Sequence, residues 1–199
     1  LTHQAATVAG TACALNRVSF AGELGWEIHA KMADIPALYD AVIGAGATPF
    51  GMYALNSMRI EKGYRAWKGD LSTDYTLLEG GHERFIKFDK PQDFPGKAAL
   101  LSEKQTGRKK GFVTLTIDDP CDFDAPYMST IWNGEEVVGE VTSSAMGYRT
   151  NKCIALGMLR ADLLEPGTKL EVEIFGGRYS ATVQADQPMW DPANERLRA

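Results

Sequence analysis

The second half of the chain is built from short β-prone segments that follow one another closely. Turn-forming pairs separate several of them, namely Asn133-Gly134, Pro166-Gly167 and Gly176-Gly177. The segments are 112–117, 129–132, 137–143, 154–159, 169–174 and 179–183. Strands this short and this closely spaced predict a small antiparallel β-barrel. The composition turns polar and basic over residues 106–111, and the boundary to the barrel is expected near residue 108.

The first half mixes strand and helix patterns. Apolar residues at helical spacing follow Asp34, which is placed to cap a helix. The predicted elements are a hairpin or bulged strand over 14–30, a helix after Asp34, a helix over 52–62, a strand over 85–88 and a helix over 97–104. We therefore expect an α+β protein with a first domain over 1–107 and the β-barrel domain over 108–199.

Composition excludes several classes of protein. The 199 residues carry a net charge of −5, which argues against a nucleic-acid partner, because phosphate neutralisation needs clustered positive charge. No apolar run approaches the ~20 residues of a membrane helix, and the N-terminus lacks the pattern of a signal peptide. Cys13, Cys121 and Cys153 are too widely spaced for a disulfide framework or a zinc site, and the three histidines are scattered. We expect no bound metal, inert thiols and a cytoplasmic location.

Glu23 and Glu27 are the first candidate functional residues. They lie in a glycine-containing, β-prone segment, where a solvent-facing edge is the commoner arrangement for two carboxylates. Glu27 lies between Trp26 and Ile28, in an apolar setting where a carboxylate needs hydrogen-bond donors. A ligand with adjacent ring N–H and amino groups, such as a pterin, would supply two parallel hydrogen bonds.

A basic stretch follows the second predicted helix. It contains Arg59, Lys62, Arg65 and Lys68, with aromatic residues between them. The stretch is typical of a solvated helix end, and the functional alternative is contact with an anionic tail or a neighbouring domain. The later segment 148–152 is polar and is expected to be a loop.

Three segments together resemble the aminomethyltransferase family, which includes the glycine cleavage T-protein. They are 19–28 (SFAGELGWEI), 54–63 (ALNSMRIEKG) and the barrel stretch 138–144 (VGEVTSS), which is followed by 154–158 (IALGM) and 167–170 (GTKL). Leu24, Trp26, 61–67 (EKGYRAW) and the stretch from Lys90 to Lys97 look like the branch of dimethylglycine and sarcosine dehydrogenases. Leu55 stands where the T-protein has an Arg, which also points to that branch.

The resemblance implies a partial folate-binding domain followed by the barrel, with tetrahydrofolate as cofactor. Glu27 matches the pterin-binding carboxylate of the family, and Ile28 and His29 would line the same strand. Phe20 stands where the family usually has Tyr, and Arg84 stands where an aromatic residue commonly packs on the folate.

The resemblance also implies a longer parent protein. FAD would belong to an N-terminal flavoprotein region, which would be the partner of this module, and the catalytic Asp of the family matches no segment here. We therefore expect the chain alone not to turn over, and an exposed apolar patch around 14–30 where the rest of the domain would pack. The alternatives are a truncated stand-alone aminomethyltransferase and a non-catalytic binding or interface module with the same fold.

Overall fold

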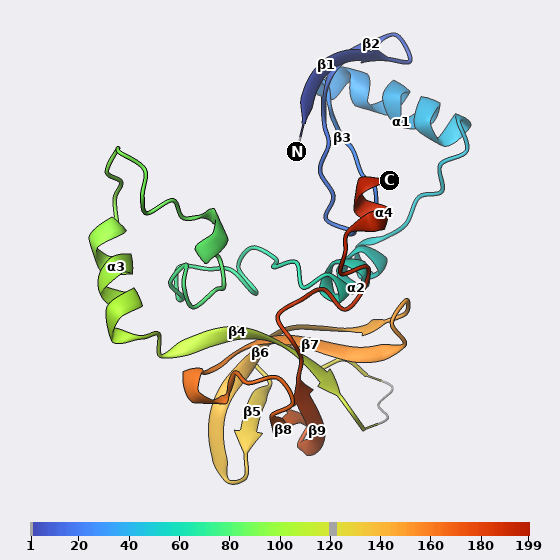
Figure 1. Ribbon diagram of the computed structural model, residues 1–199. Helices are drawn as coiled ribbons and strands as arrows, with labels where there is room; N and C mark the ends of the chain where they lie inside the picture. Colours follow the sequence, from blue (N-terminus) through green and yellow to red (C-terminus); the bar gives the residue numbers. More distant parts are fainter. Residues whose placement is uncertain (1, 120–122) are drawn as a thin grey trace.

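The computed structural model describes residues 2–119 and 123–199. Its first element is an antiparallel sheet in the order β1-β2-β3, made of β1 (His3–Val8), β2 (Thr11–Asn16) and β3 (Glu27–His29). The predicted strand over 14–30 is thus broken, because residues 17–26 are not in a strand and Gly22 has a positive φ of 79°. This sheet and the helix that follows it stand apart from the barrel (Figure 1).

The helices of the first half are confirmed and the strand is not. They are α1 (Ile35–Gly44), α2 (Met52–Glu61) and α3 (Lys97–Thr106). The strand predicted at 85–88 is wrong: residues Glu83–Phe85 form a 3₁₀ helix and Phe85 is exposed. A strand needs a partner for its backbone groups, and these residues join neither of the two sheets in the described part of the chain.

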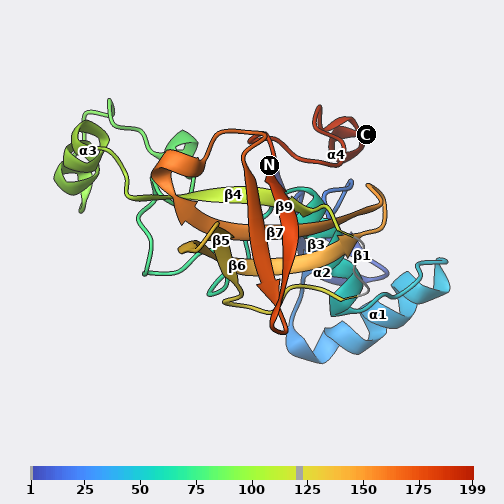
Figure 2. The ribbon, with the colours of Figure 1, turned by 90° about the horizontal axis from the view of Figure 1, so that it is seen from below.

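All six predicted barrel strands are present. They are β4 (Lys110–Ile117), β5 (Thr130–Asn133), β6 (Glu136–Gly147), β7 (Lys152–Arg160), β8 (Lys169–Ile174) and β9 (Gly177–Val183). They close into a barrel in the order β4-β7-β6-β5-β8-β9, which is seen from below in Figure 2. Leu115, Ile131 and Val141 are completely buried in its core, and each such side chain contributes about 1.5–3 kcal/mol of burial free energy.

Helix α2 joins the parts of the molecule. It packs on β6 and β7, where Ile60 forms a second apolar cluster with Ile154 and Leu156. After β9 the chain returns to the same helix, and the amides of Met189 and Trp190 donate to the carbonyl oxygen of Glu61. The tail ends in the short helix α4 (Glu195–Arg198), which lies above α2 in Figure 1. Nζ of Lys62, directly after α2, donates to the side chain of Asn194, directly before α4. The barrel and the C-terminal tail therefore meet at α2.

Two of the three cysteines lie in described strands. Cys13 is buried in β2, where its thiol donates to the carbonyl oxygen of Ala6 at 3.6 Å. Cys153 is half-buried in β7, and Cys121 lies outside the described residues. The boundary predicted near residue 108 stays a prediction; α3 ends at Thr106 and β4 begins at Lys110.

Candidate functional site

Strand β3 presents Glu27 and His29 on one face. The two residues are two apart, so their side chains project to the same side of the sheet. The Oε2 atom of Glu27 lies 3.1 Å from Nε2 of His29, and 60% and 59% of the two side chains are exposed. Ile28 points to the other face and is half-buried. Within the described residues His29 is the one hydrogen-bond partner of the Glu27 carboxylate, so acceptor capacity remains for an external donor.

Phe20 lies beside a cavity rather than on the strand itself. Its ring stacks on Tyr64 with the centroids 6.3 Å apart and an interplanar angle of 18°. Tyr64 lines a cavity of about 610 Å³, which we call the basic cavity. The aromatic pair thus connects the segment that leads into β3 with the loop that follows α2.

Arg84 lines the basic cavity too. Its guanidinium group lies 4.9 Å from the centroid of the Phe85 ring, and the side chain is exposed. The residues of β3 are not part of the cavity lining. Tyr64 and Leu197 also line a second cavity, of about 440 Å³, which reaches Ser19 and Gly25 on the segment before β3. The structure therefore places Arg84 in the basic cavity and connects Phe20 to it only through Tyr64. Glu27, Ile28 and His29 line neither of the two cavities.

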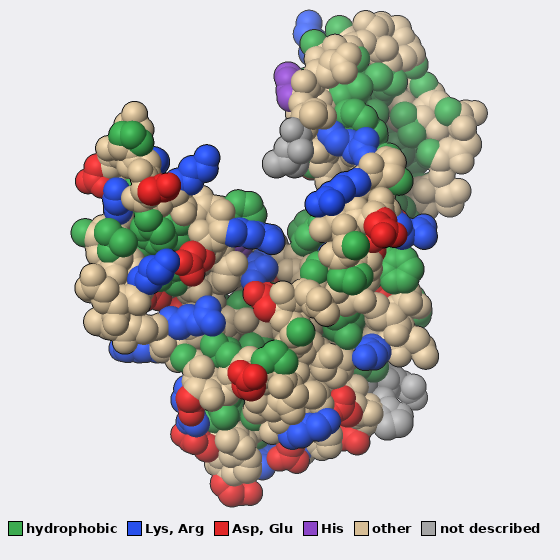
Figure 3. Space-filling view, viewed as in Figure 1, with side chains coloured by type: hydrophobic (Ala, Val, Ile, Leu, Met, Phe, Trp, Pro, Cys, Tyr) green, Lys and Arg blue, Asp and Glu red, His purple; other side chains and the backbone are tan. Residues whose placement is uncertain are grey.

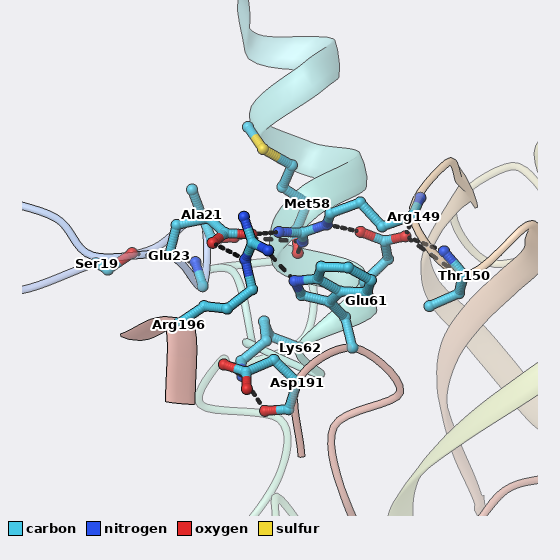
Figure 4. A network of polar contacts seen from close by, with 12 residues as sticks. Ser19, Ala21, Glu23, Met58, Glu61, Lys62, Arg149, Thr150, Asp191 and Arg196 are labelled. Carbon is cyan, nitrogen blue, oxygen red and sulfur yellow. Dashed lines mark hydrogen bonds and ion pairs between the residues drawn. The ribbon is translucent and has the colours of Figure 1, made fainter. Parts of the chain in front are cut away.

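A polar network holds the segment before β3 in place (Figure 4). Arg149, from the turn between β6 and β7, is at its centre. Its Nη1 donates to Glu23 at 2.6 Å, its Nη2 donates to the carbonyl oxygen of Met58 at 2.7 Å, and its Nε donates to Glu61. Glu61 is completely buried and also accepts from the amides of Arg149 and Thr150, at 2.8 and 2.9 Å. The predicted loop at 148–152 therefore links the barrel to α2 and to the segment before β3 through these hydrogen bonds.

The prediction that Glu23 faces solvent is wrong. Its carboxylate accepts hydrogen bonds from Arg149, from Nε1 of Trp190 at 3.0 Å and from Nε of Arg196 at 2.9 Å. Burial by itself would raise the pKa of Glu23, but these hydrogen bonds outweigh it and hold the pKa below its usual value. Glu23 thereby fixes the segment four residues before Glu27 to the barrel turn and to the C-terminal tail.

The prediction of a solvated helix end is wrong for most of the basic stretch. Arg59 is 3% exposed and its Nη1 donates to the buried Asp70 at 2.5 Å. Burial lowers the pKa of Arg59, and Asp70 opposes that effect. Lys62 is also buried, and Nζ donates to the carbonyl oxygen of Asp191 at 2.8 Å. Of the four basic residues only Lys68 is exposed, as predicted.

Exposed apolar side chains are present in the segment 14–30, where an apolar patch was expected. Phe20, Leu24 and Trp26 are 41%, 44% and 47% exposed. Strands β1 and β3 each have one unpaired edge in the described sheet. Hydrophobic side chains are visible between this sheet and α1 in Figure 3. An uncovered surface of this kind is suited to packing against another protein segment.

Neither a metal centre nor a membrane segment is found in residues 2–119 and 123–199. No group of three or more His, Cys, Asp or Glu side chains comes together there as metal ligands. No helix in that part of the chain is long and apolar enough to cross a bilayer.

Comparison with known proteins places these features in a family. Residues 1–90 match the family model described as the GCVT N-terminal domain, and residues 110–191 match the glycine cleavage T-protein C-terminal barrel domain. Mouse (Mus musculus) dimethylglycine dehydrogenase is 39% identical over 92% of this chain and 21% of its own length. Mouse sarcosine dehydrogenase is 34% identical over 99% of this chain and 22% of its own length. The chain thus spans about a fifth of these relatives.

The fold agrees with that match. The crystal structure of aminomethyltransferase T of the Bartonella henselae glycine cleavage system superposes with a TM-score of 0.82 and 23% identity. The superposition covers 90% of this chain and 50% of the Bartonella henselae chain. The sequence matches and the shared α+β-then-barrel architecture agree, and the chain belongs to the aminomethyltransferase (glycine cleavage T-protein) family.

Proposed function

We propose that this chain is a tetrahydrofolate-binding module, with Glu27 as the residue that holds the pterin ring. The observation that carries the proposal is an exposed carboxylate on β3 with His29 as its one partner within the described residues, in a chain of this family. Adjacent N–H and amino groups of a pterin would each donate to one carboxylate oxygen. Tetrahydrofolate, when bound, supplies the nitrogen atoms that accept a one-carbon unit.

Other residues support the placement of such a ligand. Ile28 and His29 would flank the pterin-binding carboxylate on the same strand. The ring of Phe20, already stacked on Tyr64, offers an apolar surface to the remainder of the ligand. The exposed guanidinium plane of Arg84 would stack on a flat ring or pair with a carboxylate.

We propose a larger protein as the setting of this module. Its similarity to dimethylglycine and sarcosine dehydrogenases supports a role in capturing the one-carbon unit of an oxidised N-methyl amine. The chain holds no glycine-rich nucleotide-binding segment that fits FAD, so amine oxidation is assigned to an N-terminal flavoprotein region. The exposed Phe20, Leu24 and Trp26 support that region as the partner. We also propose a cytoplasmic location, to be tested by cell fractionation.

We also propose that the chain alone does not catalyse the transfer. No segment of its sequence matches the catalytic Asp of the family, and removal of a general acid or base typically costs about 10²–10⁴-fold in rate. A turnover assay with formaldehyde and tetrahydrofolate, at matched protein concentrations, checks this. A rate above the protein-free reaction that is lost in the variant Glu27→Gln would contradict it.

Isothermal titration calorimetry with tetrahydrofolate tests the binding proposal. The variant Glu27→Gln should bind about 10–100-fold more weakly, because it loses a charge-assisted pair of about 1.5–3 kcal/mol. Glu135→Gln is the matched control, since its side chain is 97% exposed and lies on the barrel. Equal affinity of wild type and Glu27→Gln would favour a module that keeps the fold without using Glu27 for folate.

A further inference from the structure

The basic cavity concentrates positive charge in an acidic protein. The charged side chains that line it are four cations, Lys62, Arg65, Arg84 and Arg108, and two carboxylates, Glu83 and Asp186. The whole chain has a net charge of −5. Figure 3 shows Lys and Arg side chains between the lobe that carries α3 and the centre of the molecule.

Two of these charged groups are already engaged in the fold. Lys62 donates to the carbonyl oxygen of Asp191 and to the side chain of Asn194, at 2.8 and 2.9 Å. Glu83 forms an ion pair with Lys104. The guanidinium groups of Arg65, Arg84 and Arg108 have no ion pair with a carboxylate in the described part of the chain. Arg65 and Arg108 each donate to one backbone carbonyl oxygen, at 3.4 and 3.2 Å.

Arg65 is the most constrained of the three. Its guanidinium carbon lies 3.8 Å from the centroid of the Phe112 ring, and its buried Nε atom has no hydrogen-bond partner among the described residues. Burial lowers the pKa of Arg65, although Asp186 acts in the opposite direction. A buried donor on a charged group costs free energy unless an acceptor reaches it. The Nε atom itself is closed to solvent, but Arg65 lines the cavity, where an oxygen-bearing anion would pair with the rest of its guanidinium group.

The loop opposite Arg65 is shaped around it. A Cβ atom at Gly81 would lie 2.6 Å from Nη2 of Arg65, and Gly81 has a φ of +69°. The neighbouring His82 has a buried Nδ1 without a hydrogen-bond partner in the described residues. Burial lowers the pKa of His82, and the positive charges of Arg65 and Arg84 lower it further. The surroundings are therefore electropositive.

We propose that the basic cavity binds a small ligand through its phosphate or carboxylate groups, which Arg65, Arg84 and Arg108 pair with. A volume of about 610 Å³ lies within the range of small-molecule sites. Guanidinium groups present parallel N–H donors that match both oxyanions. The three residues come from the loop after α2, the 3₁₀ helix before α3 and the loop that leads into β4. Arg84 is shared with the proposed folate site, and the proposal goes beyond the pterin contact because no residue of β3 lines this cavity.

Calorimetric titration of the 199-residue chain with pyrophosphate and, separately, with citrate at constant ionic strength is the test. One saturable site is expected with at least one of them, and the better ligand identifies the group that the cavity prefers. Because the chain has three histidines, His82 can also be followed by NMR, and its ring signals should shift with the same dissociation constant.

Variants locate the site. Arg65→Met and Arg108→Gln should each weaken binding about tenfold or more, while Lys169→Gln removes an exposed charge on the barrel, outside this cavity, and should leave affinity unchanged. Arg108→Gln stands in if Arg65→Met, which loses the Phe112 contact, does not fold. Unsaturable heats with both ligands would overturn the proposal, as would equal affinities across the variants.

Discussion

The substitution Glu61→Gln probes the buried centre of the polar network. Oε1 of Glu61 accepts from the amides of Arg149 and Thr150, and Oε2 accepts from Nε of Arg149. A glutamine keeps one acceptor oxygen, so the two amide hydrogen bonds can survive. Its amide nitrogen would face Nε of Arg149, donor against donor, in a completely buried place.

The expected loss of unfolding free energy is about 3 kcal/mol. Breaking a buried ion pair costs about 3–5 kcal/mol, because the remaining charge is left without compensation. We expect the lower end, since Glu23 and the carbonyl oxygen of Met58 still hold Arg149. For a chain of this size the loss corresponds to a fall of about 6–12 °C in Tm.

Urea unfolding at pH 7, followed by circular dichroism, measures the effect. Glu135→Gln is the control and should stay within about 0.5 kcal/mol of wild type. In the double variant Glu61→Gln/Arg149→Met the loss of unfolding free energy should be much smaller than the sum of the two single losses, because both substitutions remove the same Glu61–Arg149 ion pair. A loss below about 1 kcal/mol for Glu61→Gln, or additive losses, would refute the view that this pair supports the fold.

Two further predictions concern Glu23 and the barrel. The folded-state pKa of Glu23 is depressed, so ionised Glu23 contributes fully to the free energy of unfolding above its unfolded-state pKa near 4.5. This contribution is lost as the pH falls through the lower folded-state pKa. Glu23→Gln should therefore flatten the pH dependence of the urea midpoint in that acid range alone. A Cβ at Gly157 would lie 2.7 Å from the carbonyl oxygen of Glu140, so Gly157→Ala should destabilise by about 1–3 kcal/mol, whereas an unchanged midpoint would contradict the close strand approach.

The barrel was predictable because its signals are local. Turn pairs such as Asn133-Gly134 and the β-prone segments between them lie close together in sequence, and β5 and β6 form where they indicate. The prediction of a strand at 85–88 was wrong for the opposite reason, because a strand depends on a neighbouring strand that a local sequence pattern does not reveal. Residues 17–26 similarly leave the strand conformation, and Glu23 in this segment bonds to residues far along the chain.

The buried charges could not be predicted from sequence. Arg149 and Glu23 are 126 residues apart, and Arg59 reaches both Asp70 and Ser143. A local stretch of charges indicates exposure, because isolated charges are rarely buried, and only the tertiary fold supplies their partners. Glu27 was identified by its resemblance to a family motif, and the structure adds that its carboxylate is exposed.

The most direct test of the central claim is a crystal structure of the chain saturated with tetrahydrofolate. We predict that the pterin amino group and an adjacent ring N–H lie within about 3 Å of the two Glu27 carboxylate oxygens, beside Ile28 and His29. A saturated complex in which the pterin lies elsewhere, with Glu27 still paired only with His29, would contradict the account.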